Sequence, residues 1–131
     1  MLCSLFVLVA GGAGSPRQAE RRSMLPGLWG GDHVQMVVSR NGARLEYDCA
    51  TGTIDQPIIV DARGRFTAKG SYTSERGGPR RDNQTASARA RYVGQVSADT
   101  MRLTVTLEDR KQRVGVFTLM RGRASLLTKC R

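Results

Sequence analysis

The chain reads HVQMVVSRNGARLEYDC over residues 33–49. Apolar and polar residues alternate along both halves of this stretch, which is the period of a β-strand with one buried face. Between the halves lies Arg40-Asn41-Gly42. Asn and Gly tolerate the positive φ angles that tight hairpin turns require. The stretch therefore predicts two antiparallel strands joined by a short turn.

The two-residue period recurs along most of the chain beyond this hairpin. Further strands are predicted at residues 57–60, 66–72, 88–96, 101–107, 114–121 and 124–130. Residues 73–86 show no periodicity and are typical of a surface loop. Small antiparallel meanders avoid exposed edges by closing on themselves. The sequence thus predicts an all-β fold, a small antiparallel up-and-down barrel of about eight short strands.

The positions that this alternation places inside the barrel mix small and large side chains. They include Ala68, Gly70, Ala88, Ala90 and Gly94 beside Phe66, Tyr72, Tyr92 and Leu103. Small residues facing large ones favour a tightly filled barrel over a roomy one.

The N-terminal residues have the pattern of an export signal. An apolar run is followed by small residues, so residues 1–15 are predicted to be a signal peptide; the alternative is an apolar N-terminal strand or helix. The run is shorter than the roughly 20 residues of a transmembrane helix, so no span is expected in the mature chain. Residues 16–25 are predicted to be a linker and residues 26–131 a single barrel domain.

Two cysteines remain once this leader is set aside. Cys49 and Cys130 are expected to form a disulfide, because thiols of exported proteins usually pair. Such a bridge ties the C-terminal end of the chain back to the start of the barrel. In the chain-entropy model, closing a loop of this length adds about 4 to 5 kcal/mol of stability.

Two short motifs resemble the barrel-closing arrangement of lipocalin-like (calycin) proteins. Gly27-Leu28-Trp29 lies just before the first predicted strand, and Arg121 ends a late one. The resemblance implies that the Arg121 guanidinium stacks on the Trp29 indole at the closed end of the barrel. Arg123, with the same parity, is the second choice of partner.

A closer resemblance covers residues 27–130. The Gly-x-Trp-Gly-Gly-x-His opening at 27–33, the Glu-Tyr-Asp-Cys-Ala segment at 46–50 and the Lys129-Cys130 pair are similar to those of small secreted bacterial proteins of unknown function. This resemblance implies a lipocalin-like fold and a location in the bacterial periplasm or outside the cell. It carries no activity over.

Catalytic chemistry is not expected. His33 lies beside Asp32 and could form a base with its orienting carboxylate, but no nucleophile has an activating context, so a solvated or capping histidine is the preferred interpretation. Asp48, Asp55 and Asp61 could meet at a barrel rim, although surface solubility explains them better. A zinc site needs several closely spaced His or Cys ligands. We therefore predict no catalytic, metal or cofactor site.

Positive charge is the strongest functional feature of the sequence. The formal net charge is +10 and the pI is near 10.8, so the surface should attract polyanions. The predicted surface-binding residues are Arg76, Arg80 and Arg81 in the long loop, joined by Arg89 and Arg91. The alternative is that coding bias makes arginine, glycine, alanine and valine abundant.

The expected partners are an anionic envelope polymer, a lipid head group or a protein target. Nucleic acid is not expected, because aromatic residues are 5% of the chain and no recognition helix or stacking platform is visible. The sequence thus predicts an exported, monomeric, non-catalytic protein that binds through exterior loops or surface. The alternative is a carrier of a small apolar ligand in or at the mouth of the barrel, which needs a cavity of roughly 300 Å³ or more.

Overall fold

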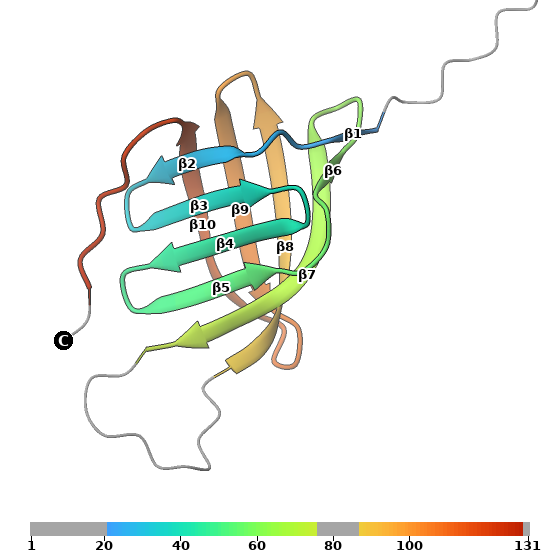
Figure 1. The fold of residues 1–131 in the computed structure, drawn as a ribbon. Helices are drawn as coiled ribbons and strands as arrows, with labels where there is room; N and C mark the ends of the chain where they lie inside the picture. Colours follow the sequence, from blue (N-terminus) through green and yellow to red (C-terminus); the bar gives the residue numbers. More distant parts are fainter. Residues whose placement is uncertain (1–20, 76–86, 130–131) are drawn as a thin grey trace, which may run out of the picture.

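The structure is a computed structural model that describes residues 21–75 and 87–129. Eight strands form a closed antiparallel barrel (Figure 1). They are β2 (Gly27–Gly31), β3 (Val34–Ser39), β4 (Gly42–Tyr47), β5 (Ala50–Ile54), β7 (Arg65–Ser74), β8 (Ser87–Ser97), β9 (Thr100–Leu107) and β10 (Gln112–Arg121). Each strand pairs with the next along the chain, and β10 returns to pair with β2. The predicted all-β up-and-down barrel is confirmed.

Six of the predicted strands agree closely with the structure. The hairpin predicted at residues 33–49 is β3–β4, and its register sets Ser39 opposite Gly42. Strands β7 to β10 match the stretches predicted at 66–72, 88–96, 101–107 and 114–121, each extended by a few residues. Within the described part of the chain, no helix has the length and hydropathy of a membrane span.

Two barrel strands differ from the prediction. Gly27–Gly31 is not a lead-in but the strand β2, paired with β3 along its whole length. The barrel strand that follows the β3–β4 hairpin is β5, whereas the sequence favoured residues 57–60. Ile59–Val60 forms the short strand β6, which pairs outside the barrel with β1 (Arg22–Ser23). Strands β2 and β5 were missed because glycine fills buried positions in β2, and alanine and glycine fill them in β5, which hides the alternation of polar and apolar residues.

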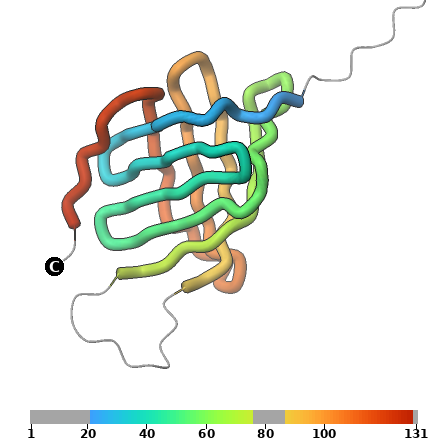
Figure 2. Tube along the Cα trace, viewed as in Figure 1, coloured from blue at the N-terminus to red at the C-terminus, as the bar shows by residue number. Residues whose placement is uncertain are grey.

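The C-terminal segment is also different from the prediction. Residues 123–129, here called the strap, form no strand; a single parallel bridge joins Leu126 to Asp32. Gly122 has φ +72°, a conformation that glycine adopts at little cost, and it turns the chain away from β10. The strap then runs past the ends of the β2–β3 and β4–β5 hairpins (Figure 2).

The N-terminal predictions are described only in part. The predicted signal peptide, residues 1–15, lies outside the described residues. Of the predicted linker at 16–25, residues 21–25 are described, and Arg22 and Ser23 among them are paired with β6. The barrel is therefore preceded by a segment that is hydrogen-bonded to residues 58–60, outside the barrel.

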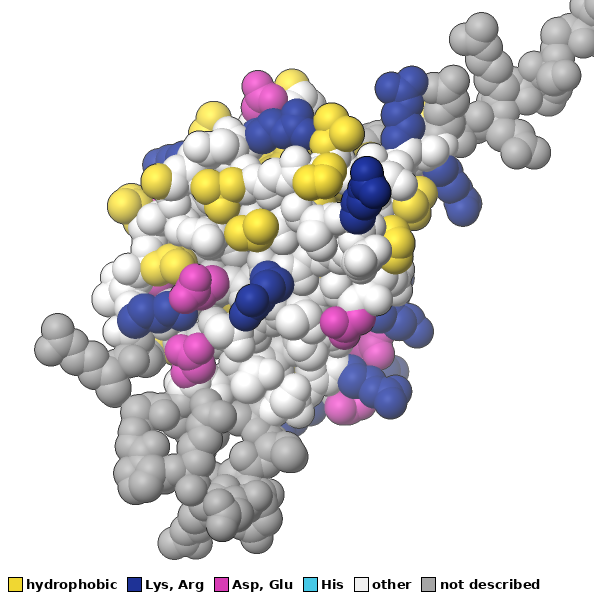
Figure 3. All heavy atoms as spheres, in the orientation of Figure 1, with side chains coloured by type: hydrophobic (Ala, Val, Ile, Leu, Met, Phe, Trp, Pro, Cys, Tyr) yellow, Lys and Arg dark blue, Asp and Glu magenta, His cyan; other side chains and the backbone are white. Residues whose placement is uncertain are grey.

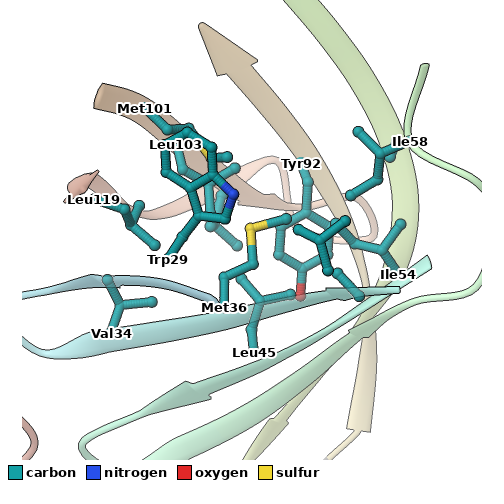
Figure 4. Packing of buried hydrophobic residues seen from close by; sticks show 14 of the residues in the cluster. Trp29, Val34, Met36, Leu45, Ile54, Ile58, Tyr92, Met101, Leu103 and Leu119 are labelled. Carbon is teal, nitrogen blue, oxygen red and sulfur yellow. The ribbon is translucent and has the colours of Figure 1, made fainter. Parts of the chain in front are cut away.

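The barrel interior is filled by its own side chains. Small residues lie opposite large ones across β7 and β8, with Gly94 facing Phe66 and Ala68 facing Tyr92. A Cβ atom added to Gly94 would overlap the Phe66 ring. Buried side chains from opposite sides of the barrel, among them Trp29, Met36, Leu45, Tyr92 and Leu103, meet at its centre (Figure 4). This packing agrees with the tightly filled interior that the sequence predicted.

Candidate anion-binding face

Strands β7 to β10 present a run of positive charges on the outside of the barrel. Their inward positions form much of the core, so the alternate residues point to solvent. The exposed basic residues at these outward positions are Arg65 and Lys69 on β7, Arg89 and Arg91 on β8, Arg102 on β9 and Arg113 on β10. We call these six residues the basic face.

The strand register gathers the six residues into rows. In one row Lys69 is paired with Arg91, Arg91 with Thr106, and Thr106 with Arg113. In a second row Gln95 is paired with both Arg65 and Arg102. Neighbouring strands lie about 4.8 Å apart and residues rise about 3.3 Å along a strand, so the basic face covers roughly 15 by 20 Å.

No acidic residue interrupts this face. The outward positions of the four strands contain no Asp or Glu; Glu108, which follows β9, lies at the margin, where its N–H donates to the Arg89 carbonyl at 3.0 Å. Among residues 21–75 and 87–129, none of the six cations forms an ion pair within 4.0 Å. Like charges placed directly opposite one another in a sheet are destabilising, as at Lys69 and Arg91. Within the described part of the chain the six cations are thus without an ion pair, and only at the edge of the face does an acidic residue, Asp61, interact with the charge of Arg65.

Hydroxyl side chains occupy many of the positions between the cations. They are Thr67, Ser71, Thr104, Thr106 and Thr118. The other intervening residues include half-buried Val93 and exposed Val116, and no outward position of the four strands carries an aromatic ring. The face thus offers charged and neutral hydrogen-bond donors and has no platform for stacking.

The side of the barrel formed by β2 to β5 has a different character. Figure 3 looks onto this side, where hydrophobic side chains gather over the upper part and side chains of both charges are scattered among and below them. Val37 is 44% exposed there, and on β4 the outward residues Arg44 and Glu46 have opposite charges. The concentration of positive charge is therefore a property of one face and not of the whole surface.

The sequence prediction found part of this face. Arg89 and Arg91 belong to it, whereas Arg76, Arg80 and Arg81 lie outside the described residues. The other four residues of the basic face were not among the predicted surface-binding residues; they are Arg65, Lys69, Arg102 and Arg113. Alternation already places these four side chains outward, but only the register of β7 to β10 shows that they lie beside Arg89 and Arg91.

The predicted contact at the closed end of the barrel is present. Trp29 is 2% exposed, and the Arg121 Cζ atom lies 5.6 Å from the centroid of its ring. This distance is within the reach of a cation–π interaction. Arg121 is paired with Trp29 in the β10–β2 register. Arg123, the second choice, lies 4.0 Å from Asp32 instead.

His33 takes part in a polar contact that attaches the strap to the barrel. Its Nδ1 atom lies 2.5 Å from Asp48 Oδ2, so its carboxylate partner is Asp48 and not the sequence neighbour Asp32. The other oxygen of Asp48 accepts a hydrogen bond of 2.7 Å from the Thr128 N–H. Lys129 Nζ lies 2.9 Å from Glu46 and donates to the Tyr47 carbonyl at 3.1 Å. These contacts, here called the clasp, hold strap residues 128 and 129 beside residues 46–48.

The electrostatics of the clasp follow from its geometry. The hydrogen bond from the Thr128 N–H is the largest effect on the pKa of Asp48 and lowers it. Desolvation raises this pKa, and the hydrogen bond to His33 lowers it further. Asp61 has separate partners, because it accepts hydrogen bonds from the Arg63 and Arg65 N–H groups within its own turn, and these lower its pKa. No three acidic, His or Cys side chains within the described ranges are grouped as a metal site would require.

The segments behind the bacterial resemblance meet at this clasp. His33 from the first segment, residues 46–48 from the second and Lys129 all contribute to it. Backbone packing there is close, since a Cβ atom on Gly30 would overlap the Arg123 carbonyl and one on Gly31 the Thr118 carbonyl. Cys130 lies outside the described residues, so its pairing with Cys49 stays a prediction, although the clasp brings residue 129 near residues 46–48. Comparison of the chain with protein-family models, curated proteins and solved structures gives no match.

Proposed function

We propose that this protein is an exported, non-catalytic binding protein whose basic face holds an anionic polymer on the outside of the barrel. The observation that carries the proposal is the arrangement of six exposed cations on four adjacent strands, with no acidic residue at the outward positions between them. A basic face of this kind concentrates anions and accelerates their binding. The net charge of +10 has the same sign.

Binding on the exterior fits the packing better than transport of an apolar ligand inside the barrel. Eight-stranded barrels have room for their own side chains or for one small ligand. Here even a methyl group at Gly52 would overlap the Tyr92 hydroxyl, and one at Gly94 would overlap Phe66. The barrel therefore serves as a scaffold for its surface.

The proposed location is the bacterial periplasm or the exterior of the cell. It is supported by the export-signal pattern of residues 1–15 and by the resemblance to small secreted lipocalin-like proteins, with which a closed eight-stranded barrel is consistent. In that compartment anionic envelope polymers are available partners. We propose that the protein acts there as a monomer.

The test compares two variants that lose the same charge at different places. Lys69→Gln/Arg91→Gln removes two cations from the basic face, whereas Arg40→Gln/Arg44→Gln removes two from the β3–β4 hairpin. Affinities for long-chain polyphosphate and for poly-L-glutamate are measured between about 0.05 and 0.2 M salt. We expect the parent to bind at least one polymer with a steep salt dependence.

The two variants should behave differently. At roughly 1 kcal/mol for each cation near an anionic surface, the basic-face variant should lose about 10- to 30-fold in affinity, and the hairpin variant much less. Binding that does not respond to salt, or equal losses in both variants, would show that the location of the charge is irrelevant and would overturn the proposal.

A further inference from the structure

We infer that the open edge of β10 is a second binding site, at which an extended acidic segment of a partner protein adds a strand to the sheet. The site lies beside the basic face and does not use Lys69 or Arg91, on which the test of the proposed function is made. The backbone of β10, the cavity beside it and the charges around that cavity support this inference.

The barrel is closed by a short stretch of strand pairing. Among the described residues, β2 pairs with β10 at Met120 and Arg121, whereas β9 pairs with β10 from Gln112 to Met120. In Figure 1, β2 meets β10 near the C-terminal end of β10, and the rest of β10 continues past it. Within the described parts of the chain, residues 112–118 of β10 therefore have a paired strand on one side alone.

The direction of the backbone groups follows from two hydrogen bonds at the end of the strand. The Arg121 N–H donates to the Asp99 carbonyl on the β9 side at 2.8 Å, whereas the Gly122 N–H donates to a carbonyl of β2 at 2.7 Å. Successive residues of a strand point their N–H and C=O groups to opposite sides. The backbone groups of Val116 and Thr118 therefore point away from β9, and no hydrogen bond from them to another described residue is found.

Free backbone groups at the edge of a sheet can pair with another strand. Proteins usually prevent this with charged side chains, proline or a bulge at the edge. Residues 114–118 of β10 are Val-Gly-Val-Phe-Thr, without a charge or a proline, and the register shift between Arg113 and Gly115 lies at their start. This stretch is about as long as an ordinary strand, so it can accept a strand through backbone hydrogen bonds, as in β-augmentation.

A cavity of about 450 Å³ lies along this edge, within the size range of binding sites. Its wall includes Val116 and Thr118 from the outward face of β10 and Phe117 from the inward face. Side chains from both faces of a strand line one cavity where the cavity passes round the edge of the strand. Residues 32 and 33 of the β2–β3 turn and Arg123 of the strap form the opposite wall.

The charges around the edge favour an acidic partner. Arg123 lines the cavity, and Arg102 and Arg113 are exposed beside the edge on β9 and β10. Asp32 is an acidic residue of the cavity wall, and its carboxylate lies 4.0 Å from an Arg123 nitrogen. Pairing with a second copy is disfavoured, because two joined β10 edges would place two basic faces side by side.

The geometry of the sheet also sets the side-chain pattern of the partner. Alternate side chains of an added strand point inward and outward. Those on the inward side lie beside the half-buried Phe117, and those on the outward side lie beside Thr118 and the neighbouring Arg102. The segment that fits this edge therefore alternates apolar and acidic residues.

The experiment adds capped peptides of about seven residues to the isotopically labelled mature protein and follows exchange of its amide hydrogens by NMR. A peptide in which Glu and Val alternate should slow exchange at Val116 and Thr118 by about 10-fold or more at saturation. The same peptide with every backbone nitrogen methylated keeps its charge but cannot donate hydrogen bonds, so it should give no protection. A peptide in which Lys and Val alternate should bind about 10-fold more weakly.

A substitution in the edge tests the role of the backbone. Val116→Pro removes an N–H that no described strand uses, a place where proline is tolerated in a sheet. It should lower affinity for the Glu-Val peptide by about 10-fold and leave binding of polyphosphate by the basic face within about twofold. Val116→Ala keeps the N–H and is the matched control, with affinity for the peptide within about threefold of the parent.

The outcomes separate this inference from the proposed function. Failure of the Glu-Val peptide to bind, or equal binding of its methylated form, would overturn the edge site and leave the basic face to its own test. Peptide binding without protection of Val116 and Thr118 would also overturn it, because charge alone would then hold the peptide. Protection of both amides in a dimer formed without peptide would assign the edge to a second copy and overturn the acidic partner.

Discussion

At the scale of the single residue, Trp29 connects the closed end of the barrel to its core. The indole is buried beneath the Arg121 guanidinium and packs in the same cluster as Leu103 and Leu119. Replacing it with alanine removes a large buried ring and leaves a cavity, so Trp29→Ala should lower the free energy of unfolding by about 3 to 5 kcal/mol. Arg121→Gln should have a smaller effect, because the ring stays in place. Urea unfolding of both variants tests this, and a Trp29→Ala variant as stable as the parent would contradict the role of the indole.

A second prediction at the scale of the residue concerns Asp48 and the pH dependence of stability. Its pKa in the folded protein is lowered, chiefly by the Thr128 N–H, below the usual value of about 3.9. Its contribution is therefore fully present above about pH 4 and is lost as the pH falls through the lower folded-state pKa. The difference in melting temperature between the parent and Asp48→Asn should be largest above about pH 5 and should shrink toward pH 2. A difference in melting temperature that stays constant over this range would show that Asp48 has the same pKa in the folded and unfolded protein.

At the scale of the element, the like charges on the paired strands β7 and β8 favour binding of an anion but destabilise the sheet. Lys69 and Arg91 are directly opposite and exposed, and such like charges destabilise a sheet. Lys69→Gln should therefore raise the melting temperature at low salt while it weakens binding of the anionic polymer. Arg44→Gln is the control, because its position is paired with Val37 and Thr53 and has no cation opposite. Loss of both stability and binding in Lys69→Gln would mean that the lysine supports the fold itself.

The strap is held by the clasp, and the predicted disulfide adds a covalent link directly after it. If Cys49 and Cys130 are bonded, reduction should lower the melting temperature of the mature protein, and Cys130→Ser should do the same without reductant. The clasp contacts of Thr128 and Lys129 stay available in both cases, so the barrel should remain folded. Titration of the denatured, unreduced protein with a thiol reagent gives the direct answer. We expect no free thiol, and two free thiols would contradict the bridge.

How much could be predicted from the sequence differs from element to element. Strands β3, β4 and β7 to β10 could be placed because polar and apolar residues alternate along them, as the burial of one face requires. Strand β5 could not, because Ala50 and Gly52 occupy two of its three inward positions. The strap could not be distinguished from a strand, since its hydrogen bonds come from hairpin ends far away in the chain.

At the scale of the whole molecule, the sequence predicted two residues of the basic face, Arg89 and Arg91, but not the other four. Outward basic residues are visible in the sequence, but a patch exists only where strands from different parts of the chain become neighbours. Residues 65 and 113 are nearly fifty positions apart, and the closed order of β7, β8, β9 and β10 places both on one face. Charge on the side formed by β2 to β5 is mixed, so the two sides of the barrel differ in charge (Figure 3).

The central claim is that this side binds the anion while the interior stays closed. The most direct test is an NMR titration of the isotopically labelled mature protein with long-chain polyphosphate. We predict shifts in the amide and guanidinium signals of outward residues on β7 to β10, with the methyl signals of Leu103, Val105 and Leu119 unchanged. Shifts confined to those interior methyl groups, or to outward residues of β2 to β5, would contradict the account.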